Sequence, residues 1–135
     1  MDVQLINEDL LNVLRKKAKT SARRRKNFDL RTMPDDNSQR MLNVMEPGTI
    51  VPIHRHDSTT ETVVCIKGKL DWVFYEEVPN MDSGGPTQEF IENFRITICP
   101  EDGQYGIQVP VGVWHTVEVH EPSVIFEAKD GAYVG

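Results

Sequence analysis

The strongest constraint on the fold is a series of short runs, rich in β-branched or aromatic residues, that fills the chain beyond residue 40. Turn formers such as Pro47-Gly48 and Asp102-Gly103 separate these runs. We predict strands over 40–45, 50–55, 61–67, 70–76, 94–98, 105–109, 114–119 and 123–128, with Pro79 to Thr87 as the longest loop. So many short strands in one domain are typical of a jelly roll or barrel. The sequence therefore predicts an all-β fold.

A single α-helix is predicted before these strands. Asn7 can cap a helix that runs to about Lys19, and its apolar stripe consists of Leu10, Leu11, Leu14 and Ala18. No linker rich in Pro, Gly or Ser divides the chain, and 135 residues suffice to bury one core. We therefore predict one domain over residues 1–135, with the helix and a basic extended segment in 1–31 and the barrel in 38–130.

The segment 48–68 contains two histidines and a glutamate, in the sequence GTIVPIHRHDSTTETVVCIKG. Their spacing is that of metal ligands. Because successive side chains of a strand alternate between its faces, His54 and His56 project to the same side. Glu61 follows His56 by five residues, so the polar stretch 57–60 must turn the chain to return Glu61 beside the histidines.

A fourth candidate ligand lies in the segment PVGVWHTVEVHEP, which predicts a turn followed by a strand. His115 shares one face of that strand with Val117 and Val119, so we expect it to point into the core. An imidazole buried there needs a partner, and a metal shared with the other three ligands would supply one. On the opposite face, His120 is expected to be solvated.

Together these segments match G-x5-H-x-H-x4-E-x6-G followed by P-x-G-x2-H, the two-part signature of the cupins. The matching residues are Gly48, His54, His56, Glu61, Gly68, Pro110, Gly112 and His115. The leading glycine of the second half is displaced and its closing asparagine is Val119, but neither position is a ligand. The resemblance implies a cupin double-stranded β-helix, which is a jelly-roll barrel, with a metal held by His54, His56, Glu61 and His115.

Three further segments, 21–31, 38–49 and 127–133, resemble the WbuC-type cupins, small bacterial metalloproteins often associated with surface-polysaccharide biosynthesis. This resemblance covers nearly the whole chain. It implies action on a sugar or nucleotide-sugar by isomerisation, epimerisation or a similar proton transfer. Two other interpretations stay open, because one fold hosts many functions: a non-catalytic, metal-dependent sugar-binding or sensor module, and an Fe(II)-dependent oxygenase.

The expected cofactor is one divalent transition metal ion. Three neutral imidazoles and one carboxylate leave such an ion with open coordination positions. We favour iron, zinc or manganese, while nickel and cobalt are also compatible with these ligands. Affinity order and metal supply decide which ion is bound, and the sequence encodes neither.

Basic residues are concentrated near the N-terminus, where eight of the fifteen lie between Arg15 and Lys26, whereas residues 41–135 carry a net charge of −10. No aromatic platform or reading helix accompanies them, so we do not expect nucleic-acid binding. If residues 23–31 are extended, one face is entirely hydrogen-bonding. The candidates to orient an anionic or sugar-like ligand are Arg23, Arg25, Asn27, Arg40 and Lys129, with Tyr133 for acid/base chemistry. The alternative is a solvated edge strand with surface ion pairs.

The remaining expectations concern location and assembly. No apolar run approaches membrane-spanning length, and the N-terminal segment has neither the basic nor the apolar region of a signal peptide. We therefore expect a cytoplasmic protein without a membrane partner, in which Cys65 and Cys99 are buried, reduced thiols. The resemblance to single-domain cupins further implies a homodimer.

Overall fold

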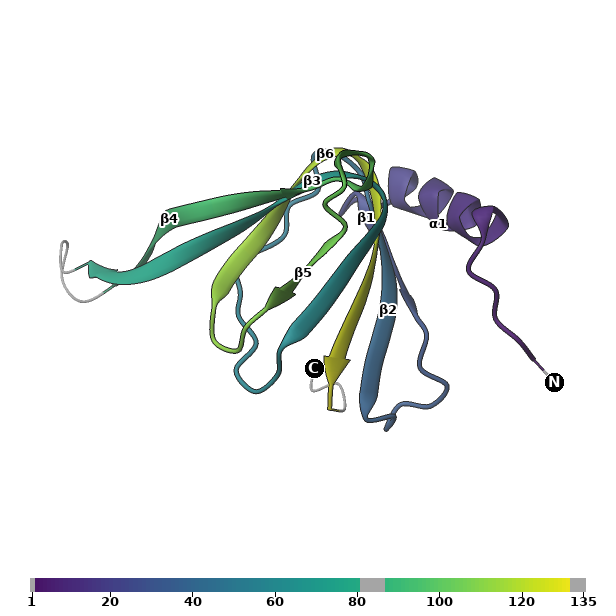
Figure 1. The fold of residues 1–135 in the computed structure, drawn as a ribbon, viewed down its shortest axis with the longest axis horizontal. Coiled ribbons are helices and arrows are strands. Elements are labelled where there is room, and N and C mark those ends of the chain that lie inside the picture. Colours follow the sequence, from purple (N-terminus) through teal and green to yellow (C-terminus); the bar gives the residue numbers. More distant parts are fainter. Residues whose placement is uncertain (1, 81–86, 132–135) are drawn as a thin grey trace.

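The structure, a computed structural model, describes residues 2–80 and 87–131 and places one α-helix beside a curled antiparallel sheet (Figure 1). The described elements are α1 (Glu8–Thr20), β1 (Arg25–Asp29), β2 (Ser38–Met45), β3 (Glu61–Asn80), β4 (Thr87–Ile98), the 3-10 turn η1 (Pro100–Asp102), β5 (Gly106–Val109) and β6 (Trp114–Asp130). The predicted all-β fold with an N-terminal helix is confirmed. None of the helices in these two ranges is long and apolar enough to cross a membrane.

Helix α1 begins and packs as its sequence predicts. The side chain of Asn7 accepts a hydrogen bond of 3.1 Å from the backbone N–H of Leu10, which satisfies one of the free donors at the helix start. The buried face of the helix packs on the outer side of the sheet. This cluster of buried residues consists of Leu11, Leu14, Ala18, Leu42, Val44 and Val124.

The sheet has the strand order β1-β2-β6-β3-β4, and β5 also pairs with β3. The predicted strands 61–67 and 70–76 are one strand, β3, and 114–119 and 123–128 are one strand, β6. Both continue through a bend at which the pairing of β3 with β6 shifts register between Cys65 and Leu70. Gly68 permits this bend, because its φ is +106° and a Cβ there would lie 2.6 Å from the carbonyl oxygen of Pro122.

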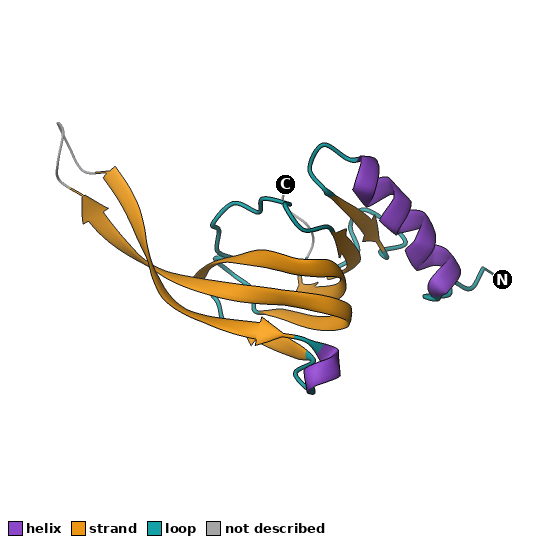
Figure 2. Ribbon diagram, turned by 90° about the horizontal axis from the view of Figure 1, so that it is seen from above, coloured by secondary structure: helices purple, strands orange, loops and turns teal. Residues whose placement is uncertain are grey.

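The prediction of a strand over 50–55 was wrong. This segment is a loop that touches the sheet through an isolated bridge between His54 and His115. The predicted loop from Pro79 to Thr87 is shorter than expected, since β3 extends to Asn80 and β4 begins at Thr87. The intervening residues 81–86 lie outside the described residues. The paired ends of β3 and β4 form an arm that extends away from the rest of the sheet (Figure 2).

Register decides which side chains face the interior of the curled sheet. Residues directly opposite each other in an antiparallel pair project to the same face. The interior core is made of the buried residues Met45, Val63, Cys65, Leu70, Trp72, Phe74, Ile98, Val109, Val117 and Ile125. Cys65 and Cys99 are buried and unpaired, as predicted, and burial raises the pKa of the Cys65 thiol to about 11.

Candidate metal centre

Backbone hydrogen bonds join the two halves of the histidine motif. The N–H of His54 donates to the carbonyl oxygen of His115 at 3.0 Å, and the N–H of His115 donates to that of His54 at 2.9 Å. The N–H of Gly112 donates to the carbonyl oxygen of His56 at 2.8 Å. Gly112 adopts a φ of +80° in the turn before β6, a conformation that favours glycine. The loop at 54–56 is therefore held against the start of β6.

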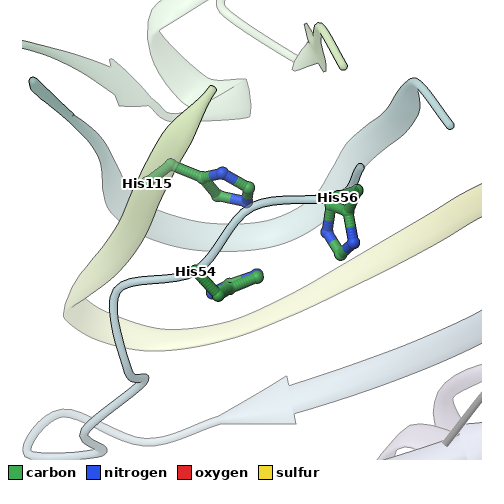
Figure 3. Close-up of side chains that lie close together, drawn as sticks. All are labelled: His54, His56 and His115. Carbon is green, nitrogen blue, oxygen red and sulfur yellow. The ribbon is translucent and has the colours of Figure 1, made fainter. Parts of the chain in front are cut away.

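Three imidazoles converge as a result (Figure 3). The ring centroids of His54 and His115 are 4.3 Å apart, those of His54 and His56 are 5.1 Å apart, and those of His56 and His115 are 5.5 Å apart. One potential ligand nitrogen from each ring lies within 4.8 Å of the other two. The three rings can therefore bind one metal ion together.

The hydrogen bonds of the rings leave nitrogen lone pairs free at this centre. The Nδ1 atom of His54 lies 2.8 Å from the carbonyl oxygen of Pro52, and that of His115 lies 2.9 Å from the carbonyl oxygen of Val113. A carbonyl only accepts, so each Nδ1 carries a proton, and in the neutral form of each ring the lone pair of Nε2 is then free. The Nε2 atom of His115 is buried without a hydrogen-bond partner among the described residues, and burial lowers the pKa of this imidazole. A neutral, oriented imidazole with an unused lone pair fits a metal ligand.

Glu61 lies beside the three histidines without joining their tight group. Its Oε2 atom is 3.1 Å from Nε2 of His56, without hydrogen-bond geometry, and 3.7 Å from Nζ of Lys129. Burial on its own would raise the pKa of Glu61, but contact with His56 and the charge of Lys129 hold that pKa below its usual value. The carboxylate is therefore ionised and adjacent to the centre, as a fourth ligand requires. Its role as a ligand stays a prediction.

A cavity of about 40 Å³ adjoins the histidines inside the curled sheet. Its lining residues are Asn43, Met45, Val51, His54, Glu61, Trp72, His115, Val117, Ile125 and Glu127. Burial and the negative charge of Glu61 raise the pKa of Glu127 to about 7. The polar residues Asn43, Trp72 and Glu127 were missed in the sequence analysis. Strand alternation was the available signal, because Glu127 has the same parity as Ile125, and Asn43 has the same parity as Met45.

Of the residues predicted to orient a ligand, Lys129, Arg25 and Asn27 lie on the interior face. Lys129 pairs in register with Glu61, and Asn27 pairs in register with Asn43. Nη1 of Arg25 donates to the carbonyl oxygen of Ile50 at 2.7 Å, so Arg25 fastens the loop that carries the histidines to β1. Their contact with a ligand stays a prediction.

The other predicted residues are not brought to the histidines. Arg23 is exposed and precedes β1, because the chain turns at Arg24, whose φ is +58°, and the predicted extended face ends there. Arg40 lies on the face of β2 opposite to its interior residues. Its guanidinium donates to the carboxylate of Asp36 at 2.9 Å and to the carbonyl oxygen of Ser38 at 2.6 Å. Tyr133 lies outside the described residues. His120, expected to be solvated, is 43 % exposed and lies 3.0 Å from Asp71.

Comparison with known proteins places the chain in a family. The family described as "Domain of unknown function (DUF6016)" matches residues 6–84, more than half of the sequence. The chain belongs to this family. No curated protein matches the sequence. The family description assigns no activity, so the function of this DUF6016 protein is inferred from its fold and its side chains.

Solved structures similar to this DUF6016 protein have the cupin fold. The capsular polysaccharide assembling protein CapF from Staphylococcus aureus is 17% identical, with a TM-score of 0.55, and the match covers 85% of this chain and 30% of CapF. A cupin-2 domain protein from Shewanella frigidimarina is 19% identical, with a TM-score of 0.51 over 78% of this chain and 79% of that chain. An oxalate oxidase is 15% identical, with a TM-score of 0.58, and the match covers 87% of this chain and 56% of the oxidase chain. At these identities the likeness shows the fold, and the chain spans less than a third of CapF.

Proposed function

We propose that this protein is a metal-dependent cupin in which His54, His56 and His115 hold one divalent transition metal ion, with Glu61 as a fourth ligand. The observation that carries the proposal is the convergence of three imidazoles, two of which have their Nδ1 protons committed to backbone carbonyls. Such bonds orient metal-ligating histidines and fix their tautomer. Iron, zinc and manganese are the ions we favour for this ligand set.

We further propose that the protein acts on a sugar or nucleotide-sugar of surface-polysaccharide biosynthesis, as a WbuC-type cupin. The supporting observations are the three sequence segments that resemble this group and the likeness in fold to CapF, which is described as a capsular polysaccharide assembling protein. The metal would polarise a carbonyl or hydroxyl group of the ligand. The carboxyl group of Glu127, in the cavity and with a pKa of about 7, can hold or release a proton near neutral pH. This position suits isomerisation or epimerisation.

One experiment tests this function against its alternatives. Protein of known metal content is incubated with a panel of nucleotide-sugars, with and without oxygen. Turnover without oxygen is the expected result for an isomerase or epimerase. Saturable binding without turnover would instead establish a sensor or binding module, and oxygen consumption linked to a sugar would establish an oxygenase. Neither binding nor turnover across the panel would contradict the sugar assignment.

A further inference from the structure

The buried polar atoms that lack a partner are concentrated around one cavity. In residues 2–80 and 87–131, buried side-chain atoms without a hydrogen-bond partner are Asn43 Oδ1, Glu46 Oε1, His56 Nε2, Trp72 Nε1 and His115 Nε2. Three of these residues, Asn43, Trp72 and His115, line the cavity beside the histidines. A buried polar group without a partner destabilises a fold, so each such atom needs a partner from outside the chain, such as a water, an ion or a ligand, or a functional reason for being left unpaired. A metal ion accounts for His115 but not for the other two.

Trp72 and Asn43 offer opposite hydrogen-bonding roles. The indole Nε1–H of Trp72 only donates, and the residue is 2 % exposed, so bulk water does not satisfy it. The Oδ1 atom of Asn43 only accepts. A ligand that satisfies both atoms needs an acceptor for Trp72 and a donor for Asn43. A hydroxyl group supplies both, whereas a carboxylate supplies acceptors alone.

The charges around the cavity also favour an uncharged ligand. Glu61 and Glu127 both line it, and although a metal ion would offset the charge of Glu61, a carboxylate in this cavity would still be placed beside the carboxyl group of Glu127. The ammonium group of Lys129 already lies 3.7 Å from the carboxylate of Glu61. Arg25 is within electrostatic range of Glu127, but its guanidinium is bonded to the loop carbonyl of Ile50. The free space of about 40 Å³ admits only a small group, such as the hydroxyl-bearing end of a longer molecule.

We propose that Trp72 and Asn43 form a hydroxyl-recognising subsite next to the three histidines, which selects neutral polyhydroxylated ligands over carboxylates of the same length. This proposal rests on the proposed function and deepens it, since it names the chemical class that the sugar site accepts. The metal is needed only to bind an oxygen atom of the ligand that lies outside the subsite. Trp72 supplies the donor and Asn43 supplies the acceptor.

The test compares erythritol with erythronate, a neutral polyol and a carboxylate that share a four-carbon skeleton. Trp114 lies outside the cavity, with its ring against Arg55 and Phe90, so Trp114→Phe leaves Trp72 as the single tryptophan reporter. We expect erythritol to change the Trp72 fluorescence of this variant saturably. We expect erythronate to bind at least about tenfold more weakly, because a carboxylate cannot donate the hydrogen bond that Asn43 accepts.

Two variants then remove one partner each, and calorimetric titration measures erythritol binding. Trp72→Phe keeps the aromatic ring and removes the N–H, while Asn43→Leu keeps much of the volume and removes the oxygen. Each is expected to weaken erythritol binding about tenfold, with Trp114→Phe unchanged as the control. Thermal unfolding and metal content are measured for every variant, and if one variant fails to fold the other still tests the subsite.

The outcomes separate the subsite from the metal centre. Metal-loaded protein that binds erythronate as well as erythritol, or that binds erythritol equally with and without the Trp72 N–H, would overturn the subsite and leave the metal proposal standing. Absence of erythritol binding at every concentration would also overturn the subsite. Protein that contains no metal but binds erythritol through Trp72 would support the subsite and contradict the metal proposal.

Discussion

His54 and His115 are hydrogen-bonded to each other through both of their peptide groups, at 3.0 and 2.9 Å, although 61 positions separate them in the sequence. A directly opposed antiparallel pair projects its side chains to one face, and here the two imidazole centroids are 4.3 Å apart. The backbone therefore holds these two ligands together before any ion binds. Such preorganisation favours tight and specific metal binding.

The first prediction concerns metal content. Purified protein is expected to bind about one equivalent of a divalent transition metal per chain, and His54→Ala combined with His56→Ala should remove it because too few ligands remain. Elemental analysis measures both proteins. His120→Ala is the matched control, since His120 lies beside Asp71 rather than in the histidine group. Wild-type protein without metal, even after reconstitution, would contradict the metal centre.

The second prediction tests Glu61 as the fourth ligand. Glu61→Gln keeps the size of the side chain but removes the charge 3.1 Å from His56, so metal affinity should fall about tenfold or more. Competition with a chromogenic chelator measures the affinity. Glu121→Gln, at an exposed position of β6, serves as the control. Equal affinities in wild type and Glu61→Gln would restrict the ligands to the histidines.

The third prediction separates two arginines that the sequence analysis grouped together. Arg25 fastens the histidine-bearing loop on the interior face, whereas Arg40 binds Asp36 and faces away. Lysine keeps the charge but loses the planar fork. Arg25→Lys should therefore weaken binding of a nucleotide-sugar by about 1 to 3 kcal/mol, and Arg40→Lys by about 0 to 1 kcal/mol. Titration calorimetry gives both values, and equal affinities in the two variants would assign Arg25 a purely structural role.

The fourth prediction concerns acid stability. Burial of Asp71 would raise its pKa, but contacts with Thr97 at 2.7 Å, His120 at 3.0 Å and Arg95 at 3.2 Å hold that pKa below its usual value. A lowered pKa means that the unfolded state binds more protons, so this stabilisation is present above about pH 4 and is lost as the pH falls through the folded-state pKa.

Asp71→Asn should remove this contribution. We expect it to reduce the free energy of unfolding by about 1 to 3 kcal/mol at pH 7, and by progressively less as the pH falls below about 4. Urea unfolding at a series of pH values measures the difference from wild type. Asp35→Asn, at an exposed turn, is the control. A difference that does not change with pH would show that Asp71 acts through packing rather than charge.

The fifth prediction is a homodimer, and the arm formed by β3 and β4 supports it. Ile91 on this arm is 55% exposed and Phe94 at its base is 51% exposed, and a two-stranded ribbon is only marginally stable without further packing. We expect twofold assembly with the arm buried, the commonest symmetry of oligomers. Light scattering should report about twice 15.4 kDa, and Ile91→Asp should return the protein to the monomer. A wild-type monomer at micromolar concentration would contradict this expectation.

The sequence predicted the helix and the β architecture because both depend on local patterns. Asn7 and the leucine stripe specify α1, and alternation specifies the faces of β6. Local patterns did not show that 50–55 is a loop, since Ile50, Val51 and Ile53 have high strand propensity. Its pairing is limited to one bridge with residue 115, a contact that depends on the folding of the whole chain.

The candidate site, like the fold, was predicted only in part from the sequence. His54, His56 and His115 come together as the cupin motif implies, although His54 and His56 lie on a loop and not on the strand whose alternation was expected to put them on one side. Asn43, Trp72 and Glu127 were missed because each looks like an ordinary strand residue in sequence. Only the pairing of β2, β3 and β6 places them around one cavity. Arg40 was grouped with the ligand-orienting residues because of its charge. Its position in β2, however, places its side chain on the face opposite to the cavity.

The position of β6 in the sheet has a consequence for how the protein is made. Among the described strands it is the last in sequence, yet it lies between β2 and β3 in the sheet. During synthesis, β2 and β3 leave the ribosome before the strand that will separate them, and each waits with an unsatisfied hydrogen-bonding edge. Such edges invite pairing with the wrong strand or with another nascent chain. His54 likewise gains its backbone partner only when residue 115 arrives, so the histidine centre cannot form before that residue has left the ribosome.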